Sequence, residues 1–133
     1  MKLLFATANQ NKAKEIRAVL PAGIELLSLK DIELNEEIPE TSETIEGNAV
    51  QKANYILDNF QIDCFADDTG LEVHALNGEP GVHSARYAGA HRNDDDNMNL
   101  LLSKLDGSAD RSARFKTVIA LTINGELFKF EGI

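Results

Sequence analysis

Helix-like and strand-like segments alternate along the chain, and this alternation restricts the fold more than any other feature of the sequence. Short apolar runs predict strands at residues 2–6, 24–27 and 62–67. Helical spacing and capping residues predict helices at about 11–20, 44–60 and 96–105. The last segments, 113–123 and 126–132, flank Asn124-Gly125 and are typical of a β-hairpin. Interleaved helices and strands indicate an α/β or α+β fold.

We expect residues 1–133 to form a single domain. The chain has 133 residues, 43% of them apolar and 26% charged, which is enough to bury one core and ordinary for a globular protein. No repeat, linker or low-complexity segment interrupts it. Residues 31–43 are acidic and contain Pro39, so they predict a loop with a turn or two.

Composition also restricts the partners and the compartment. The formal net charge of −9 argues against nucleic-acid binding, which needs a basic surface, but it leaves room for a small phosphorylated ligand held with a metal ion. The single cysteine, Cys64, excludes an internal disulfide and is interpreted as a buried thiol. Neither a signal peptide nor a membrane span of roughly 20 apolar residues is found, so we expect a cytoplasmic protein without membrane contact.

Two adjacent aspartates, Asp67 and Asp68, follow the apolar run 62–67, and Glu72 adds a third carboxylate. Like charges so close together repel, which indicates a positive partner such as Mg²⁺, an ion that prefers oxygen ligands shared with substrate phosphates. Adjacent strand residues point to opposite faces, so both aspartates serve one metal only if the strand ends there; the turn-prone Thr69-Gly70 allows this. The alternative, an acidic loop cap, stays equally open on these residues alone.

The segment TANQNK, residues 7–12, leads from a predicted strand into a predicted helix. Free backbone N–H groups at such a helix start attract anions, and Lys12 adds a full charge beside the polar side chains of Thr7 and Asn9. The spacing is not that of a P-loop. Taken alone, this stretch favours a plain helix start with a surface lysine.

Other polar groups carry simpler interpretations. Asp94, Asp95 and Asp96 lie at a helix start and are interpreted as caps, since the glycine and final glutamate of a calcium loop are missing. The three histidines show no metal-ligand spacing. Glu40 is a possible further ligand that nothing local distinguishes from its acidic neighbours.

Four stretches together resemble the family of inosine/xanthosine triphosphate pyrophosphatases over the whole chain. ATANQNKAKE is similar to its T-x-N-x-x-K-x-x-E opening, and IPETSETIEGNAVQKA to its second motif. ADDTGLEVHALNGEPGVHSARYAG resembles its signature, and ARFKTVIAL followed by FEGI continues the match to residue 133. The matched positions are Thr7, Asn9, Lys12 and Glu15 in the first motif and Glu40, Thr41, Asn48 and Lys52 in the second.

The resemblance implies an elongated α/β fold around a long mixed sheet, with a cleft between two lobes, and a homodimer. It implies Mg²⁺-dependent hydrolysis of ITP, dITP and XTP to the monophosphate and pyrophosphate. By position, Glu40 and Asp68 become the metal carboxylates with Asp67 beside them, and Asp68 also orients or deprotonates the attacking water. The implied substrate contacts are Thr7, Asn9, Lys12, Lys52 and Thr69.

Two further motifs of the family, a GFGYDP-like segment and a lysine followed by SHR, have no match in this sequence. They serve base recognition, so residues 1–133 correspond to the N-terminal two-thirds of the family fold. A non-catalytic chain that binds Mg²⁺ and nucleotide is therefore the alternative function. A haloacid-dehalogenase-type phosphatase needs D-x-D-G-[TV], whereas the order here is D-D-T-G.

Overall fold

A computed structural model describes residues Met1–Ile133 and places the strands in one six-stranded mixed sheet. The strands are β1 (Lys2–Phe5), β2 (Glu25–Leu27), β3 (Cys64–Val73), β4 (Pro80–Gly81), β5 (Ala113–Ile123) and β6 (Glu126–Gly132). They follow the order β2-β1-β3-β5-β6, and β4 pairs with β3 alone. β1 is parallel to β2 and β3, whereas β5 is antiparallel to β3 and β6. The predicted α/β class with a mixed sheet is confirmed.

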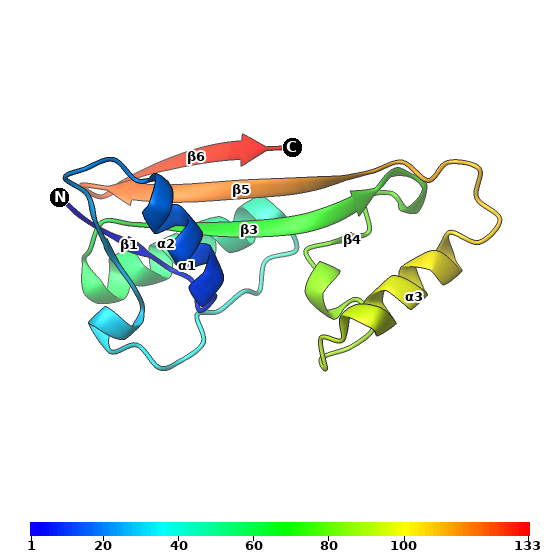
Figure 1. Cartoon of the computed structure of the whole chain (residues 1–133), viewed down its shortest axis with the longest axis horizontal. Coiled ribbons are helices and arrows are strands. Elements are labelled where there is room, and N and C mark those ends of the chain that lie inside the picture. The colour runs from blue at the N-terminus through cyan, green and yellow to red at the C-terminus, as the bar shows by residue number, and fades with distance from the viewer.

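The sheet gives the molecule an elongated shape, because β3 and β5 run between two lobes (Figure 1). One lobe contains β1, β2 and the helices α1 (Gln10–Val19) and α2 (Ile45–Phe60). The other contains β4 and α3 (Asp94–Lys104). The elongated two-lobed arrangement expected from the family resemblance is therefore confirmed.

Each helix begins at a side chain that caps it. The capping oxygens belong to Asn9, Thr44 and Asn93, and each accepts a hydrogen bond from the backbone N–H three residues on. The third helix begins at Asp94, two residues before the predicted start, because Asn93 is its cap. Asp94–Asp96 then lie in its first turn, so the capping interpretation of these carboxylates is confirmed.

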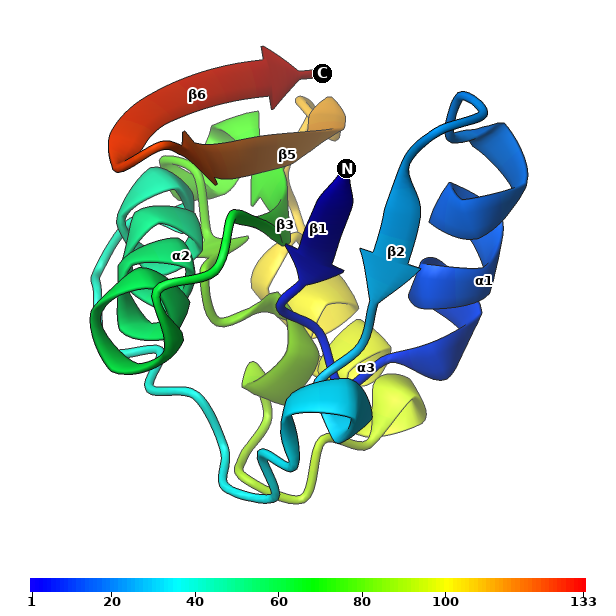
Figure 2. The same ribbon diagram turned by 90° about the vertical axis from the view of Figure 1, so that its left-hand side faces the viewer.

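Helices α1 and α2 cover opposite faces of the sheet (Figure 2). Alternating side chains of β1 pack into the apolar cores on both faces of the sheet. Leu3 and Phe5 pack on the α1 side, and the next residues, Leu4 and Ala6, pack on the α2 side. The α2 side holds ten buried residues, among them the predicted buried thiol Cys64, and the α1 side holds five. The larger core therefore lies under α2, and this face positions the buried half of the site.

Strand β3 does not end at the aspartates, and the prediction that residues 62–67 are the whole strand is wrong. β3 starts at Cys64, passes through Asp67 and Asp68, and continues to Val73. The cause is β5, which pairs with every residue of β3 in an unbroken antiparallel ladder. The turn tendency of Thr69-Gly70 is overridden by this long-range pairing.

The remaining segments agree with the sequence predictions. Residues 31–43 form a loop whose regular part is a short 3-10 turn at Lys30–Ile32. The segments 113–123 and 126–132 form the predicted hairpin, β5 and β6. No helix of the structure has the length and apolar character that crossing a membrane requires.

Candidate active site

A cavity of about 640 Å³ lies beyond the carboxyl end of β1 and is walled by both lobes. One wall comes from the β1–α1 loop, the loop before α2, and β3; Ala85 and Arg92 close the opposite side. The lining includes the predicted site residues Thr7, Asn9, Lys12, Glu40, Lys52, Asp67, Asp68 and Thr69. A second cavity of about 630 Å³, near His74 and Arg114, contains none of them. The structure thus collects every predicted site residue around one cavity.

The β1–α1 loop presents the N-terminus of α1 to this cavity. Its turn is held by side chains, because Thr7 Oγ1 accepts from the Asn9 backbone N–H at 3.1 Å. Asn9 Oδ1 in turn accepts from the Lys12 backbone N–H at 3.1 Å. Residues predicted to hold phosphate therefore also fix the loop, and the positive end of the α1 dipole adds to the charge of Lys12.

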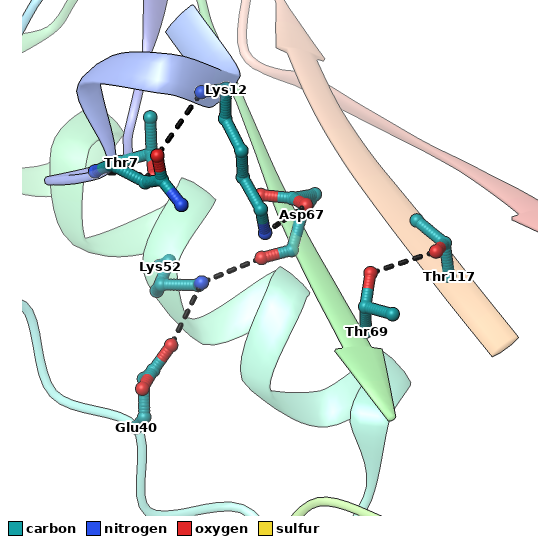
Figure 3. Close-up of polar contacts among 8 residues, drawn as sticks. Thr7, Lys12, Glu40, Lys52, Asp67, Thr69 and Thr117 are labelled. Atoms are coloured by element: carbon teal, nitrogen blue, oxygen red, sulfur yellow. Dashed lines mark hydrogen bonds and ion pairs between the residues drawn. The ribbon is translucent and has the colours of Figure 1, made fainter. Parts of the chain in front are cut away.

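Lys12 and Asp67 form an ion pair on the α1 side of β3. Lys12 Nζ lies 2.9 Å from Asp67 Oδ2, and the two side chains are 41% and 13% exposed. Figure 3 shows the Lys12 chain extending from α1 down to this carboxylate. The negative charge of Asp67 is therefore compensated within the protein.

Lys52 occupies the centre of the α2 side. Its Nζ donates to the Asp67 carbonyl oxygen at 2.6 Å and pairs with Glu40 Oε1 at 2.8 Å (Figure 3). The side chain is only 12% exposed, so the ammonium group has few positions available. Lys52 therefore ties the strand backbone to the loop that carries Glu40.

Asp68 lies on the α2 side, opposite its neighbour Asp67. Burial raises the pKa of Asp68; Lys52 opposes this rise, Glu40 adds to it, and hydrogen bonding from Asn48 and the Thr69 backbone lowers the pKa. Despite these contacts, Asp68 Oδ2 is buried and has no hydrogen-bond partner. A buried carboxylate oxygen without a partner is costly, which indicates that it is built to bind something else.

The donor set fits a hard divalent cation, although not through all three predicted ligands. Asp68 offers an unpartnered oxygen, and Glu40 is close enough to influence its ionisation. Asp67 points to the other face and is bound by Lys12. No three acidic, histidine or cysteine side chains lie close enough together to hold a metal ion. Glu40 and Asp68 are thus brought together, and Asp67 is kept apart from them.

Comparison with known proteins decides the family. A sequence model of the Ham1 family matches residues 3–133. This chain is a member of the Ham1 family.

Named relatives and solved structures match this chain over 99–100% of its length. A dITP/XTP pyrophosphatase of Flavobacterium johnsoniae is 59% identical over 133 residues, covering all of this chain and 69% of the relative. The Ham1 protein of Staphylococcus aureus superposes with a TM-score of 0.92 at 35% identity, over 99% of this chain and 69% of that one. A HAM1 protein from Coxiella burnetii gives a TM-score of 0.93 at 32% identity, over 99% of this chain and 70% of that one.

Two further residues lie next to the predicted site residues, and neither had a predicted role. Asn48 lies in the second motif, one turn before Lys52; its side chain is buried, and its Oδ1 accepts from the Ser42 backbone N–H at 2.8 Å. Thr117 was not predicted at all; its hydroxyl lies 2.7 Å from that of Thr69. Only the β3–β5 register reveals Thr117, since 48 positions separate it from Thr69.

Proposed function

We propose that this Ham1 chain hydrolyses the deaminated purine nucleoside triphosphates dITP, XTP and ITP to the monophosphate and pyrophosphate. The relatives named dITP/XTP pyrophosphatase support this reaction. The observation that carries it is the buried, unpartnered oxygen of Asp68, a residue that lines the same cavity as Lys52 and the N-terminus of α1. Such a site offers a carboxylate for water and positive groups for a polyphosphate.

The residues have distinct roles in the proposed reaction. The α1 N-terminus, with Thr7, Asn9 and Lys12, holds phosphate oxygens, and Lys52 holds the triphosphate from the α2 side. Asp68 accepts a proton from water as the water oxygen attacks the α-phosphorus. The bond to the α,β-bridging oxygen breaks, and pyrophosphate leaves with the electron pair. Thr69 contacts the substrate from β3.

We propose Mg²⁺ as the cofactor, held by Glu40 and Asp68 together with substrate phosphates; Asp67, on the opposite face of β3, would reach the ion only if it left Lys12. A bound Mg²⁺ ion supplies charge neutralisation at the reacting phosphates. Carboxylate oxygens are the hard ligands that this ion prefers, and the ion would share substrate phosphates because it seldom occupies an all-protein cage. Lys52 holds Glu40 in position, and its positive charge reduces the repulsion between the carboxylates of Glu40 and Asp68.

Further expectations belong to the same proposal. We propose that residues 1–133 are one domain, corresponding to the N-terminal two-thirds of the fold, and that the chain is a cytoplasmic homodimer. The relatives that match all of this chain carry the name of an enzyme, which favours turnover over the alternative of nucleotide binding without it.

Product analysis tests the proposed reaction. Incubation of the chain with dITP or XTP and Mg²⁺ is followed by separate assays of pyrophosphate and orthophosphate, and the nucleotide product is identified by chromatography. We expect pyrophosphate and the monophosphate in equal amounts. Release of orthophosphate with a diphosphate would contradict the cleavage position. Nucleotide binding without any product would favour the non-catalytic alternative.

A further inference from the structure

Four cationic side chains line the cavity of the candidate active site, and only one of them comes from the lobe that contains α3. Lys12, Lys30 and Lys52 come from α1, from the 3-10 turn after β2, and from α2. Arg92 lies on the loop before α3 and closes the cavity from the opposite side. Arg92 is therefore the one positive group that can reach a ligand in this cavity from the lobe of α3.

Arg92 has no acidic partner in the protein, unlike the two lysines that were predicted to bind substrate. Lys12 and Lys52 each form an ion pair with a carboxylate that also lines the cavity. None of the eight ion pairs of the structure includes Arg92, although three aspartates follow it at residues 94–96. Lys30 is unpaired as well, but it belongs to the same side of the cavity as the other lysines. The whole charge of Arg92 is thus available to an anion that enters between the lobes.

The backbone of Arg92 has a left-handed conformation, with φ of 51°. This region is uncommon for a residue other than glycine and costs strain for a long side chain. The other non-glycine residues with positive φ end a helical turn or lie in the β5–β6 turn, where the conformation is usual: Glu33, Gln61, Asn77 and Asn124. Arg92 instead precedes Asn93, the cap at the start of α3. Glycine or asparagine would adopt this conformation with less strain, so the presence of arginine points to a role for its side chain.

We propose that Arg92 is a further substrate-binding residue, which contacts the triphosphate from the lobe of α3 while the α1 N-terminus and Lys52 contact it from the other lobe. This inference rests on the proposed function for the identity of the ligand. The planar guanidinium group can donate two parallel hydrogen bonds to phosphate oxygens, whereas a lysine ammonium acts as a point charge. Arg92 is remote from the carboxylates proposed to act on water and metal, since it comes from the opposite wall of the cavity. We therefore expect it to contribute to affinity for the triphosphate and not to the chemical step.

Two substitutions at Arg92 and one matched control test this role in the full chain. Arg92→Gln removes the charge and keeps a long polar side chain. Arg92→Lys keeps the charge and removes the planar group of donors. Arg111→Gln is the control, because Arg111 is exposed and lies outside the cavity, and its loss changes the net charge of the chain by the same amount.

Isothermal titration calorimetry in Mg²⁺ measures the affinity for two probes. One is a dITP analogue whose α,β-bridging oxygen is replaced by CH₂, and the other is inorganic tripolyphosphate, which has no base. For Arg92→Gln we expect both affinities to fall by about tenfold or more, because charge-assisted hydrogen bonds to phosphate are lost. Arg92→Lys should show a smaller loss, and Arg111→Gln should stay within about twofold of the unsubstituted chain, since solvent and salt screen an exposed charge.

Steady-state kinetics and thermal unfolding complete the comparison. With dITP as substrate, Arg92→Gln should raise KM by about tenfold and leave kcat within about threefold, as expected for a group that binds substrate and transition state equally. The melting temperature without ligand should stay unchanged, because Arg92 makes no ion pair with the protein.

The outcomes keep this inference separate from the proposed reaction. Unchanged affinity for both probes in Arg92→Gln would overturn the phosphate contact and leave the reaction intact. Loss of affinity for the dITP analogue alone, or failure of the unsubstituted chain to bind tripolyphosphate, would also overturn it, because the affinity would then come from the base or the sugar. Weaker binding together with a lowered melting temperature would mean that Arg92 acts through the fold, and would overturn it as well.

Failure of the reaction gives a different result. A chain that binds both probes without turnover of dITP would overturn the proposed function, and the affinities of the Arg92 variants would still decide the role of that residue. Absence of binding for both probes, together with absence of turnover, would overturn both proposals.

Discussion

The two sides of strand β3 treat neighbouring aspartates in opposite ways. On the α1 side, Asp67 is paired with the half-exposed ammonium of Lys12. On the α2 side, Asp68 is buried with one oxygen left without a partner, and the cation nearest to it, Lys52, is shared with Glu40 and a backbone carbonyl. The chain compensates one charge itself and leaves the other for a ligand. We therefore expect Asp68 to contribute more to the reaction than its neighbour Asp67.

The largest expected effect concerns turnover in the two aspartate variants. Asp68→Asn should lower kcat by about 10² to 10⁴, because it removes the group proposed to accept the proton of water. Asp67→Asn should lower it by less than about tenfold, since Lys12 already engages that carboxylate. Steady-state pyrophosphate release from dITP measures both. Equal losses of kcat in the two variants would contradict the proposed difference between Asp67 and Asp68.

Ligand-dependent stability sharpens the same comparison. Mg²⁺ with a nucleoside triphosphate at a hundred times its dissociation constant should stabilise the folded chain by about 2.7 kcal/mol. Mg²⁺ alone should contribute far less, because the ion shares substrate phosphates. Thermal melts with and without Mg²⁺ and nucleotide give the ligand-dependent rise in stability for the unsubstituted chain and for Asp68→Asn. We expect Asp68→Asn to lose most of this rise. A full response to Mg²⁺ alone would indicate a structural metal site.

The two lysines offer a matched pair of substitutions. Lys52→Met should lower the free energy of unfolding by about 1.5–3 kcal/mol, since it removes hydrogen bonds from a buried charged group and leaves Glu40 and Asp68 uncompensated. Lys12→Met should cost less than about 1 kcal/mol, because the Lys12 side chain is 41% exposed and solvent screens its ion pair. Urea unfolding measures both values. A larger loss of stability in Lys12→Met than in Lys52→Met would mean that the lysine on the α1 side of β3 contributes more to stability.

The smallest effect is a pH dependence of stability at Asp68. Burial raises the pKa of this group in the folded state, so its contribution to stability is fully present below the unfolded pKa, near 3.8, and is lost as pH rises through the folded pKa. Without metal, Asp68→Asn should therefore gain stability relative to the unsubstituted chain as pH is raised from about 4 toward neutrality. Paired urea titrations across this range test the sign. A constant difference would mean that burial does not disfavour the Asp68 charge.

Local patterns were sufficient to predict most elements of the fold. Helix α2 and the β5–β6 hairpin agree with the sequence to within one residue, because an N-cap, an apolar stripe and Asn124-Gly125 act over short distances. The length of β3 was underestimated for the opposite reason. Its second half is held by pairing with β5, whose partner residues are 40 or more positions away in sequence, as the Thr69–Thr117 contact shows.

The sequence by itself determined the order of the elements and the helix caps, and the family resemblance pointed to eight of the 20 residues that line the cavity. The tertiary structure alone decided which carboxylate is compensated and which has a free oxygen. The reason is physical: alternation along β3 turns Asp67 and Asp68 to different faces, and their partners come from distant segments, since Lys12 and Asp67 are 55 residues apart in sequence. Burial then penalises the unpartnered charge, and neither burial nor these pairings can be derived from the two adjacent aspartates in the sequence.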